Sequence, residues 1–126
     1  MATSADQPGR AVTLSAGRSP GGQPFVELHA LSNYSFLRGA SHPEELVEQA
    51  AKLGYQGIAI TDECSFAGLV KAHLAAKDHD IQLIIGAEFH LEEGIHLVLL
   101  APDRAGYGQL AGLISKLRRR SPKGEY

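Results

Sequence analysis

The sequence alternates between short apolar runs typical of β-strands and longer segments that carry apolar residues at helical spacing. The runs at 25–32, 57–61 and 82–91 predict strands, and the segments between them predict helices. A strand followed by a helix and another strand predicts a right-handed crossover between parallel strands. This order restricts the chain to an α/β fold.

Both predicted helices have recognisable starts. Ser41, His42, Pro43 and Glu44 form a capping-box pattern before an apolar stripe, and Gly54 offers a left-handed stop after it. The second helix is expected to begin at about Ser65, whose hydroxyl could cap it. Its apolar stripe consists of Phe66, Leu69, Val70, His73 and Leu74.

The last part of the sequence breaks the parallel pattern. A fourth apolar run at 95–101 follows the third after only "EEG", which is too short for a crossover, so the two runs predict an antiparallel hairpin. Asp103 is expected to cap a final helix that reaches Leu117. Because a complete (β/α) barrel needs about 250 residues, 126 residues predict half of one, with an open sheet edge and poor solubility in isolation.

Composition limits the function classes. The 12 basic and 14 acidic residues give a net charge of −2, which disfavours a self-sufficient nucleic-acid binder. No apolar run is long enough to cross a bilayer, and the single Cys64 fits a reducing cytoplasm. Residues 1–24, rich in Gly, Pro, Ser and Ala, predict a disordered tail without a targeting signal, followed by one domain over 25–126.

Imidazoles and carboxylates gather where the predicted strands end. In parallel α/β folds ligands bind at the carboxyl ends of strands, because the loops there vary while the strands hold them rigidly. Such side chains are ligands for zinc, manganese and similar divalent ions, which can activate water on a phosphate ester. The candidates are Glu27, His29, Asp62, Glu63, Glu88 and His96.

Several of these residues also have structural interpretations. His29 beside Glu27 fits a hydrogen-bonded pair on one strand face. Asp62 and Glu63 fit caps of the following helix, where their charges would complement the helix dipole. These alternatives stay open on the residues alone.

Other polar residues favour no specific chemistry. Cys64 fits an inert buried thiol, and the cluster "KLRRR" at 116–120 fits either a solvated helix end or a minor DNA-facing surface. The chain has no glycine-rich phosphate loop and no serine-nucleophile elbow, which disfavours a nucleotide kinase or a serine hydrolase. No role is assigned to His42, His73, His79 and His90.

Four motifs occur in order along the chain. They are "ELHALSNYSFLRG" (27–39), "AITDE" (59–63), "GAE" (86–88) and "HLVLLAPDRAGYGQLAGLISK" (96–116). Together they resemble the PHP (polymerase and histidinol phosphatase) domain at the N-terminus of bacterial C-family DNA polymerases. Within that family the sequence is most similar to the error-prone, damage-inducible members, with the replicative alpha subunits as the nearer rival.

The resemblance implies a distorted (β/α)7 TIM-like barrel of which this chain holds the first half. It implies a cytoplasmic parent protein that is a DNA-directed DNA polymerase, acting in replication and damage-induced translesion synthesis, with Mg²⁺ in a polymerase domain absent here. The implied partners are the remainder of the polymerase chain, DNA and dNTPs through it, a sliding clamp and mutagenesis accessory proteins, with no membrane.

The sequence departs from the family pattern at three positions. Leu31 replaces a histidine, Arg38 replaces an acidic residue and would repel a cation, and Glu63 replaces the histidine of T-D-H. The resemblance therefore implies a weak or vestigial site for Zn or Mn and no catalytic residues in this chain. The implied ligands are His29, Asp62, Glu88 and His96, with Glu27 and Glu63 as substitutes.

Two other functions remain open at this point. A stand-alone metal-dependent phosphoesterase, similar to histidinol phosphatases or 3′–5′ exonucleases, would need most of the metal ligands. A non-catalytic interaction module would need none.

Overall fold

The computed structural model describes residues 24–126, so nearly all of the predicted N-terminal tail at 1–24 lies outside the described residues. Strands and helices follow in the predicted order. They are β1 (Val26–Ala30), α1 (Pro43–Lys52), β2 (Gly57–Ile60), α2 (Leu69–Asp78), β3 (Gln82–His90), β4 (His96–Ala101) and α3 (Arg104–Arg120).

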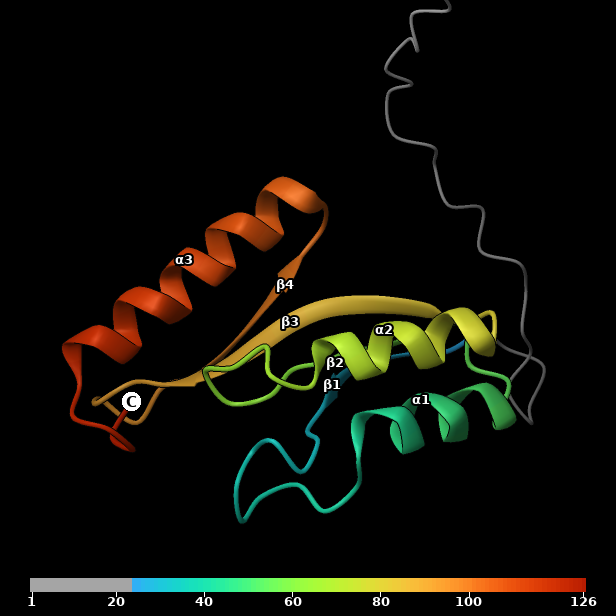
Figure 1. Ribbon diagram of the computed structural model, residues 1–126, viewed down its shortest axis with the longest axis horizontal. Coiled ribbons are helices and arrows are strands. Elements are labelled where there is room, and N and C mark those ends of the chain that lie inside the picture. Colours follow the sequence, from blue (N-terminus) through green and yellow to red (C-terminus); the bar gives the residue numbers. More distant parts are fainter. Residues whose placement is uncertain (1–23) are drawn as a thin grey trace, which may run out of the picture.

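The four strands form one open sheet in the order β1-β2-β3-β4. β1 pairs with β2 and β2 with β3 in parallel, whereas β3 and β4 form the predicted antiparallel hairpin. Figure 1 shows α1 and α2 next to one another, with α3 lying along the hairpin at the other end of the sheet. The architecture is a mixed α/β half-barrel, which confirms the predicted fold class.

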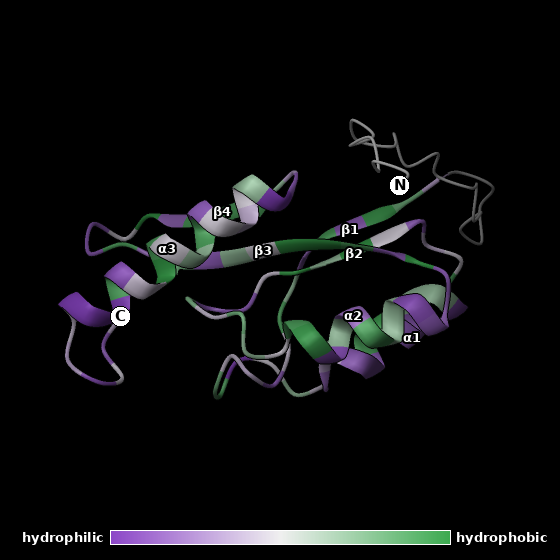
Figure 2. Cartoon of the chain, turned by 45° about the horizontal axis from the view of Figure 1, so that its top comes forward, coloured by the Kyte–Doolittle hydropathy of each residue, from purple (hydrophilic) through white to green (hydrophobic). Residues whose placement is uncertain are grey.

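All three helices cover the same face of the sheet. Ile58, Ile60 and partly buried Leu83 pack with α1 and α2, while Ala87 and Phe89 of β3 pack with α3. Leu83, Ala87 and Phe89 are separated by even numbers of residues along β3, so their side chains point to one face. β3 is hydrophobic through much of its length, and the C-terminal end of α3 is hydrophilic (Figure 2).

The ends of α1 and α3 lie close to their predicted positions, but the capping box of α1 is one residue later than the predicted Ser41–Glu44 pattern and joins His42 to Glu45. The backbone N–H of His42 donates to Glu45 Oε2 at 2.8 Å, which supplies one half of a capping box, and Gly54 adopts a φ of 75° after α1. Asp103 Oδ1 accepts a hydrogen bond of 2.8 Å from the N–H of Gly106 at the start of α3. Short-range capping chemistry therefore sets these boundaries.

The predicted start and stripe of α2 are wrong. The helix begins at Leu69, and Ser65 lies in the preceding turn, where its Oγ accepts a hydrogen bond from the N–H of Ala67. Val70 and Leu74 are 70% and 57% exposed, whereas Ala72 and Ala76 are buried. The small side chains of these alanines let α2 approach α1 and the sheet closely. The alanines, and not Val70 and Leu74, therefore form the packed face of α2.

β1 does not keep the regular alternation expected for 25–32. Glu27 pairs with Ile58 and Ala30 with Ile60, so three residue steps along β1 match two along β2. This irregularity is a β-bulge, which shifts side chains from one face to the other. Glu27 and His29 consequently do not share one face of a regular strand.

No helix or strand among residues 24–126 covers the sheet face opposite the helices, and the loop after β1 covers this face only at the end that carries Glu88. Leu28 and Leu100 are 49% and 39% exposed, and β1 and β4 are the edge strands of this sheet. The poor solubility expected of the isolated chain stays a prediction. No helix in this part of the chain has the length and apolar character required to cross a membrane.

The close approach of β3 and β4 depends on Gly86. A β-carbon there would lie 2.8 Å from the carbonyl oxygen of Leu99 and 2.7 Å from Cδ2 of Leu100. We predict that Gly86→Ala lowers the free energy of unfolding by about 1–3 kcal/mol, because the backbone of β4 must move. The matched change Gly112→Ala, in open space on α3, should raise it by up to about 1 kcal/mol. Urea denaturation measures both, and equal effects would contradict this packing.

Candidate functional site

The polar site lies beyond the carboxyl end of β2, where the chain pairs with β3 near the carboxyl end of that strand. Glu63 and Glu88 form an isolated parallel bridge. The N–H of Cys64 donates to the carbonyl of Glu88 at 2.8 Å, and the N–H of Glu88 donates to the carbonyl of Asp62 at 3.1 Å. These backbone hydrogen bonds bring the motifs "AITDE" (59–63) and "GAE" (86–88) side by side.

Glu88 is the buried centre of this site. Its side chain is 1% exposed, and both carboxylate oxygens have partners. Oε2 lies 2.5 Å from His29 Nε2, whereas Oε1 accepts a hydrogen bond of 2.7 Å from Arg38 Nη1 and contacts His90 Nε2. A buried carboxylate of this kind needs such donors to remain charged.

The charge state of Glu88 follows from these contacts. Burial by itself would raise the pKa of Glu88, but hydrogen bonds with His90, His29 and Arg38 outweigh burial and lower the pKa to about 2. The same contact with Glu88 raises the pKa of Arg38 above its usual value. Glu88 and Arg38 therefore form an ion pair at neutral pH.

Arg38 reaches two more groups of the site. Its Nη1 atom lies 3.4 Å from Glu63 Oε2 and 3.0 Å from His90 Nε2. His90 Nδ1 in turn lies 3.6 Å from Glu63 Oε1. The guanidinium thus lies among two carboxylates and an imidazole, although the sequence suggested only that its charge would repel a metal ion.

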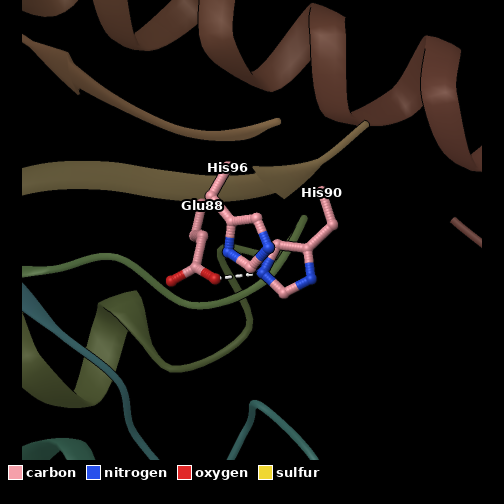
Figure 3. A group of neighbouring side chains, drawn as sticks. All are labelled: Glu88, His90 and His96. Carbon is pink, nitrogen blue, oxygen red and sulfur yellow. Dashed lines mark hydrogen bonds and ion pairs between the residues drawn. The ribbon is translucent and has the colours of Figure 1, made fainter. Parts of the chain in front are cut away.

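His90 is the site residue that the sequence analysis missed. Glu88, His90 and His96 each offer one ligand atom within 4.8 Å of the others (Figure 3). The rings of His90 and His96 stack across the hairpin with centroids 4.2 Å apart. A signal existed, because His90 lies two residues after Glu88 on the same strand and therefore on the same face.

Asp62 faces a different set of partners. Its Oδ1 accepts hydrogen bonds from the backbone N–H of Ser32 at 2.7 Å and from the hydroxyl of Ser35 at 2.8 Å. Its Oδ2 accepts one from the Ser32 hydroxyl at 2.6 Å. Asp62 is 2% exposed, so this carboxylate holds the loop after β1 against the end of β2.

Glu27 makes only a local contact, and neither acidic residue after β2 caps a helix. Glu27 Oε1 accepts a 3.0 Å hydrogen bond from the backbone N–H of His29, which is a local contact. Because α2 begins at Leu69, neither Asp62 nor Glu63 caps it, and the helix-cap interpretation is wrong.

Cys64 and the basic cluster have structural contacts. Cys64 is buried, and burial raises the pKa of its thiol, which fits the inert interpretation. The Nε of Arg118 donates to the carbonyl of Cys64 at 2.7 Å, and its guanidinium lies 4.0 Å from the ring centroid of Tyr126. At least one arginine of 116–120, Arg118, therefore connects α3 to the turn at Cys64.

The ligand types fit a divalent metal, but the arrangement does not. Glu88, His90 and His96 have the spacing of a metal-binding group. However, Arg38 and His90 already contact Glu88 Oε1, and His29 contacts Oε2. A metal ion would have to displace a positively charged group from the most buried ligand.

Comparison with known proteins places this geometry in a family. The sequence profile described as the PHP domain matches residues 27–126. This chain belongs to the PHP domain family. The match covers every residue of the site and omits only Val26 from the described strands.

Curated relatives share most of this PHP sequence. It is 66% identical over 102 residues to the error-prone DNA polymerase of Methylococcus capsulatus, and 54% identical over 102 residues to that of Saccharophagus degradans. Each alignment covers 81% of this chain and 10% of the relative. The chain therefore spans about a tenth of the length of the curated relatives it matches.

Solved structures of lower identity share the PHP fold. An amidohydrolase from Chromobacterium violaceum, with bound sulfate and no metal, is 31% identical with a TM-score of 0.62. A candidate metal-dependent phosphoesterase from Bifidobacterium adolescentis is 27% identical with a TM-score of 0.57. Each match covers 75% of this chain and 33% of the other.

We predict that Asp62→Ala destabilises the domain whether or not metal is present. The change leaves three buried donors of Ser32 and Ser35 without an acceptor, so the free energy of unfolding should fall by about 3 kcal/mol or more. Asp62→Asn keeps one acceptor oxygen and should cost less. Urea denaturation with and without EDTA tests this, and a loss that appears only when metal is supplied would contradict a structural role.

Glu88 should make the domain sensitive to acid. Its folded-state pKa of about 2 lies below the ordinary value of 4.5, so its charge stabilises the fold above about pH 4.5 and this contribution is lost as pH falls towards 2. Glu88→Gln should be less stable than wild type at pH 6, with a difference that shrinks at pH 3. Glu93→Gln, in the exposed hairpin turn, is the control. A constant difference between pH 6 and pH 3 would argue against the lowered pKa.

Proposed function

We propose that this chain is the N-terminal PHP portion of an error-prone DNA polymerase. The 66% identity to the Methylococcus capsulatus enzyme is the observation that carries the proposal, because it extends over nearly all of the described residues. The reaction of the whole protein would be templated DNA synthesis from dNTPs, using Mg²⁺ in a polymerase domain beyond the part matched here. Its setting would be replication and damage-induced translesion synthesis in the cytoplasm.

Within that protein the PHP portion, over 25–126, would support the polymerase structurally. The uncovered sheet face and its edge strands suit contact with the remainder of the polymerase chain. DNA, dNTPs, a sliding clamp and mutagenesis accessory proteins would bind through other parts of the protein. This agrees with the net charge of −2, which offers little attraction for DNA.

The metal site would be degenerate in this role. Zn or Mn would bind weakly at the group formed by Glu88, His90 and His96, with His29 and Glu63 next to it. Loss of metal ligands reduces affinity and activity steeply in such centres. We therefore assign no catalytic residue in this chain.

Activity assays on the longer protein that carries this sequence test the proposal. It should extend a primer on undamaged and damaged templates with dNTPs and Mg²⁺, and it should release no phosphate from phosphate monoesters with Zn or Mn. A protein that hydrolyses phosphate monoesters or DNA 3′ ends and extends no primer would be a phosphoesterase. A protein without either activity would be an interaction module.

The structural role has its own test in the same protein. Asp62→Ala should lower the temperature at which primer extension is lost, because the loop after β1 loses its anchor. Ser115→Ala, at an exposed position of α3, is the matched control and should leave that temperature unchanged. Equal inactivation temperatures for the two variants and wild type would argue against structural support by this domain.

A further inference from the structure

We propose that Arg38 is the resident cation of this site, occupying with its guanidinium the position among the ligands that a divalent metal would otherwise take. The inference deepens the degenerate-site proposal and rests on it. It assigns to Arg38 a specific task, which is to balance the buried charge of Glu88 without a metal ion.

The distances around one nitrogen atom carry this proposal. Nη1 of Arg38 lies 2.7 Å from Glu88 Oε1, 3.0 Å from His90 Nε2 and 3.4 Å from Glu63 Oε2. Carboxylate oxygen and imidazole nitrogen are the ligand types of zinc and manganese. The positively charged Nη1 therefore contacts two carboxylates from separate parts of the chain and lies beside the His90 imidazole, whose Nε2 already contacts Glu88 Oε1.

Charge makes the guanidinium suitable for this position. Glu88 is buried and charged, and Glu63 adds a second carboxylate next to it. A guanidinium stays protonated throughout the physiological pH range, so its charge needs neither metal supply nor a particular pH. Placing a divalent ion beside it would add like-charge repulsion.

The loop that carries Arg38 is held in place by the Asp62 network. The backbone N–H groups of Arg38 and Gly39 both donate to the carbonyl of Ser35 at 3.0 Å, and the Ser35 hydroxyl donates to Asp62. A β-carbon on Gly39 would lie 2.0 Å from the carbonyl oxygen of Ser32, so the backbone is packed tightly there. Asp62 thus positions the loop from which the Arg38 side chain reaches Glu88.

Restricted access does not account for the exclusion of metal. The side chain of His29 is 50% exposed, and that of Arg38 is 34% exposed, so a hydrated ion can reach the edge of the site. What opposes binding is the existing ion pair with Glu88. Removing the positive charge of Arg38 while keeping the volume of its side chain should therefore allow a metal ion to bind.

The test measures metal content in the longer protein that carries this sequence, after equilibrium dialysis against zinc and, separately, manganese. Arg38→Met removes the charge and should bind about one more ion per chain than wild type, with an apparent affinity at least about tenfold tighter. Arg38→Lys keeps a positive charge and should gain none. Arg119→Met, at an exposed position of α3, controls for loss of any arginine. Adding Glu88→Gln to Arg38→Met should abolish the gain.

The outcomes separate this inference from the proposals beneath it. No extra metal in a cooperatively melting Arg38→Met protein would overturn the resident cation and leave the weak-site proposal standing. Tight metal binding by wild type that Glu88→Gln removes would overturn both. If Arg38→Met fails to fold, wild type and Glu88→Gln still decide when they are dialysed at a metal concentration too low to fill a weak site. Equal metal contents are then expected, and a lower content in Glu88→Gln would contradict the inference.

Discussion

A fully buried carboxylate needs hydrogen-bond donors or positive charges as partners, and the residues around Glu88 supply them. Glu88 lies near the carboxyl end of β3, between the chain that follows β2 and the hairpin strand β4. Without compensation, a charge at this depth would destabilise the fold strongly. Three different parts of the chain contribute partners: His29 from β1, Arg38 from the following loop and His90 from β3 itself.

The two buried carboxylates of the site have separate roles. Asp62 is satisfied by neutral donors, namely the N–H and hydroxyl of Ser32 and the hydroxyl of Ser35, and it fixes the loop after β1. Glu88 is satisfied mainly by basic side chains, one of which that loop supplies. The position of Arg38 thus depends on Asp62, and the charge of Glu88 depends on Arg38. Asp62 and Glu88 are therefore linked through one loop, although they share no hydrogen-bond partner.

Much of this fold could be predicted because the signals are local. Apolar periodicity identified the strands and helices, and the "EEG" connection and Asp103 identified the hairpin and the last helix. The start of α2 was missed because the turn after Cys64 depends on backbone contacts with β3, and the bulge in β1 depends on its pairing with β2. In the site, strand ends located His29, Glu88 and His96, but motif matching left out His90. The sequence predicted only that the charge of Arg38 would repel a metal ion. The structure shows that Arg38 contacts the carboxylates of Glu88 and Glu63.

Anomalous X-ray diffraction can show whether Arg38 or a metal ion lies next to Glu88. Crystals of the longer protein grown with excess manganese should show the Arg38 guanidinium within hydrogen-bonding distance of Glu88 and no manganese peak between Glu88, His90 and His96. A manganese peak bound by these three side chains, with Arg38 turned away towards solvent, would contradict the account.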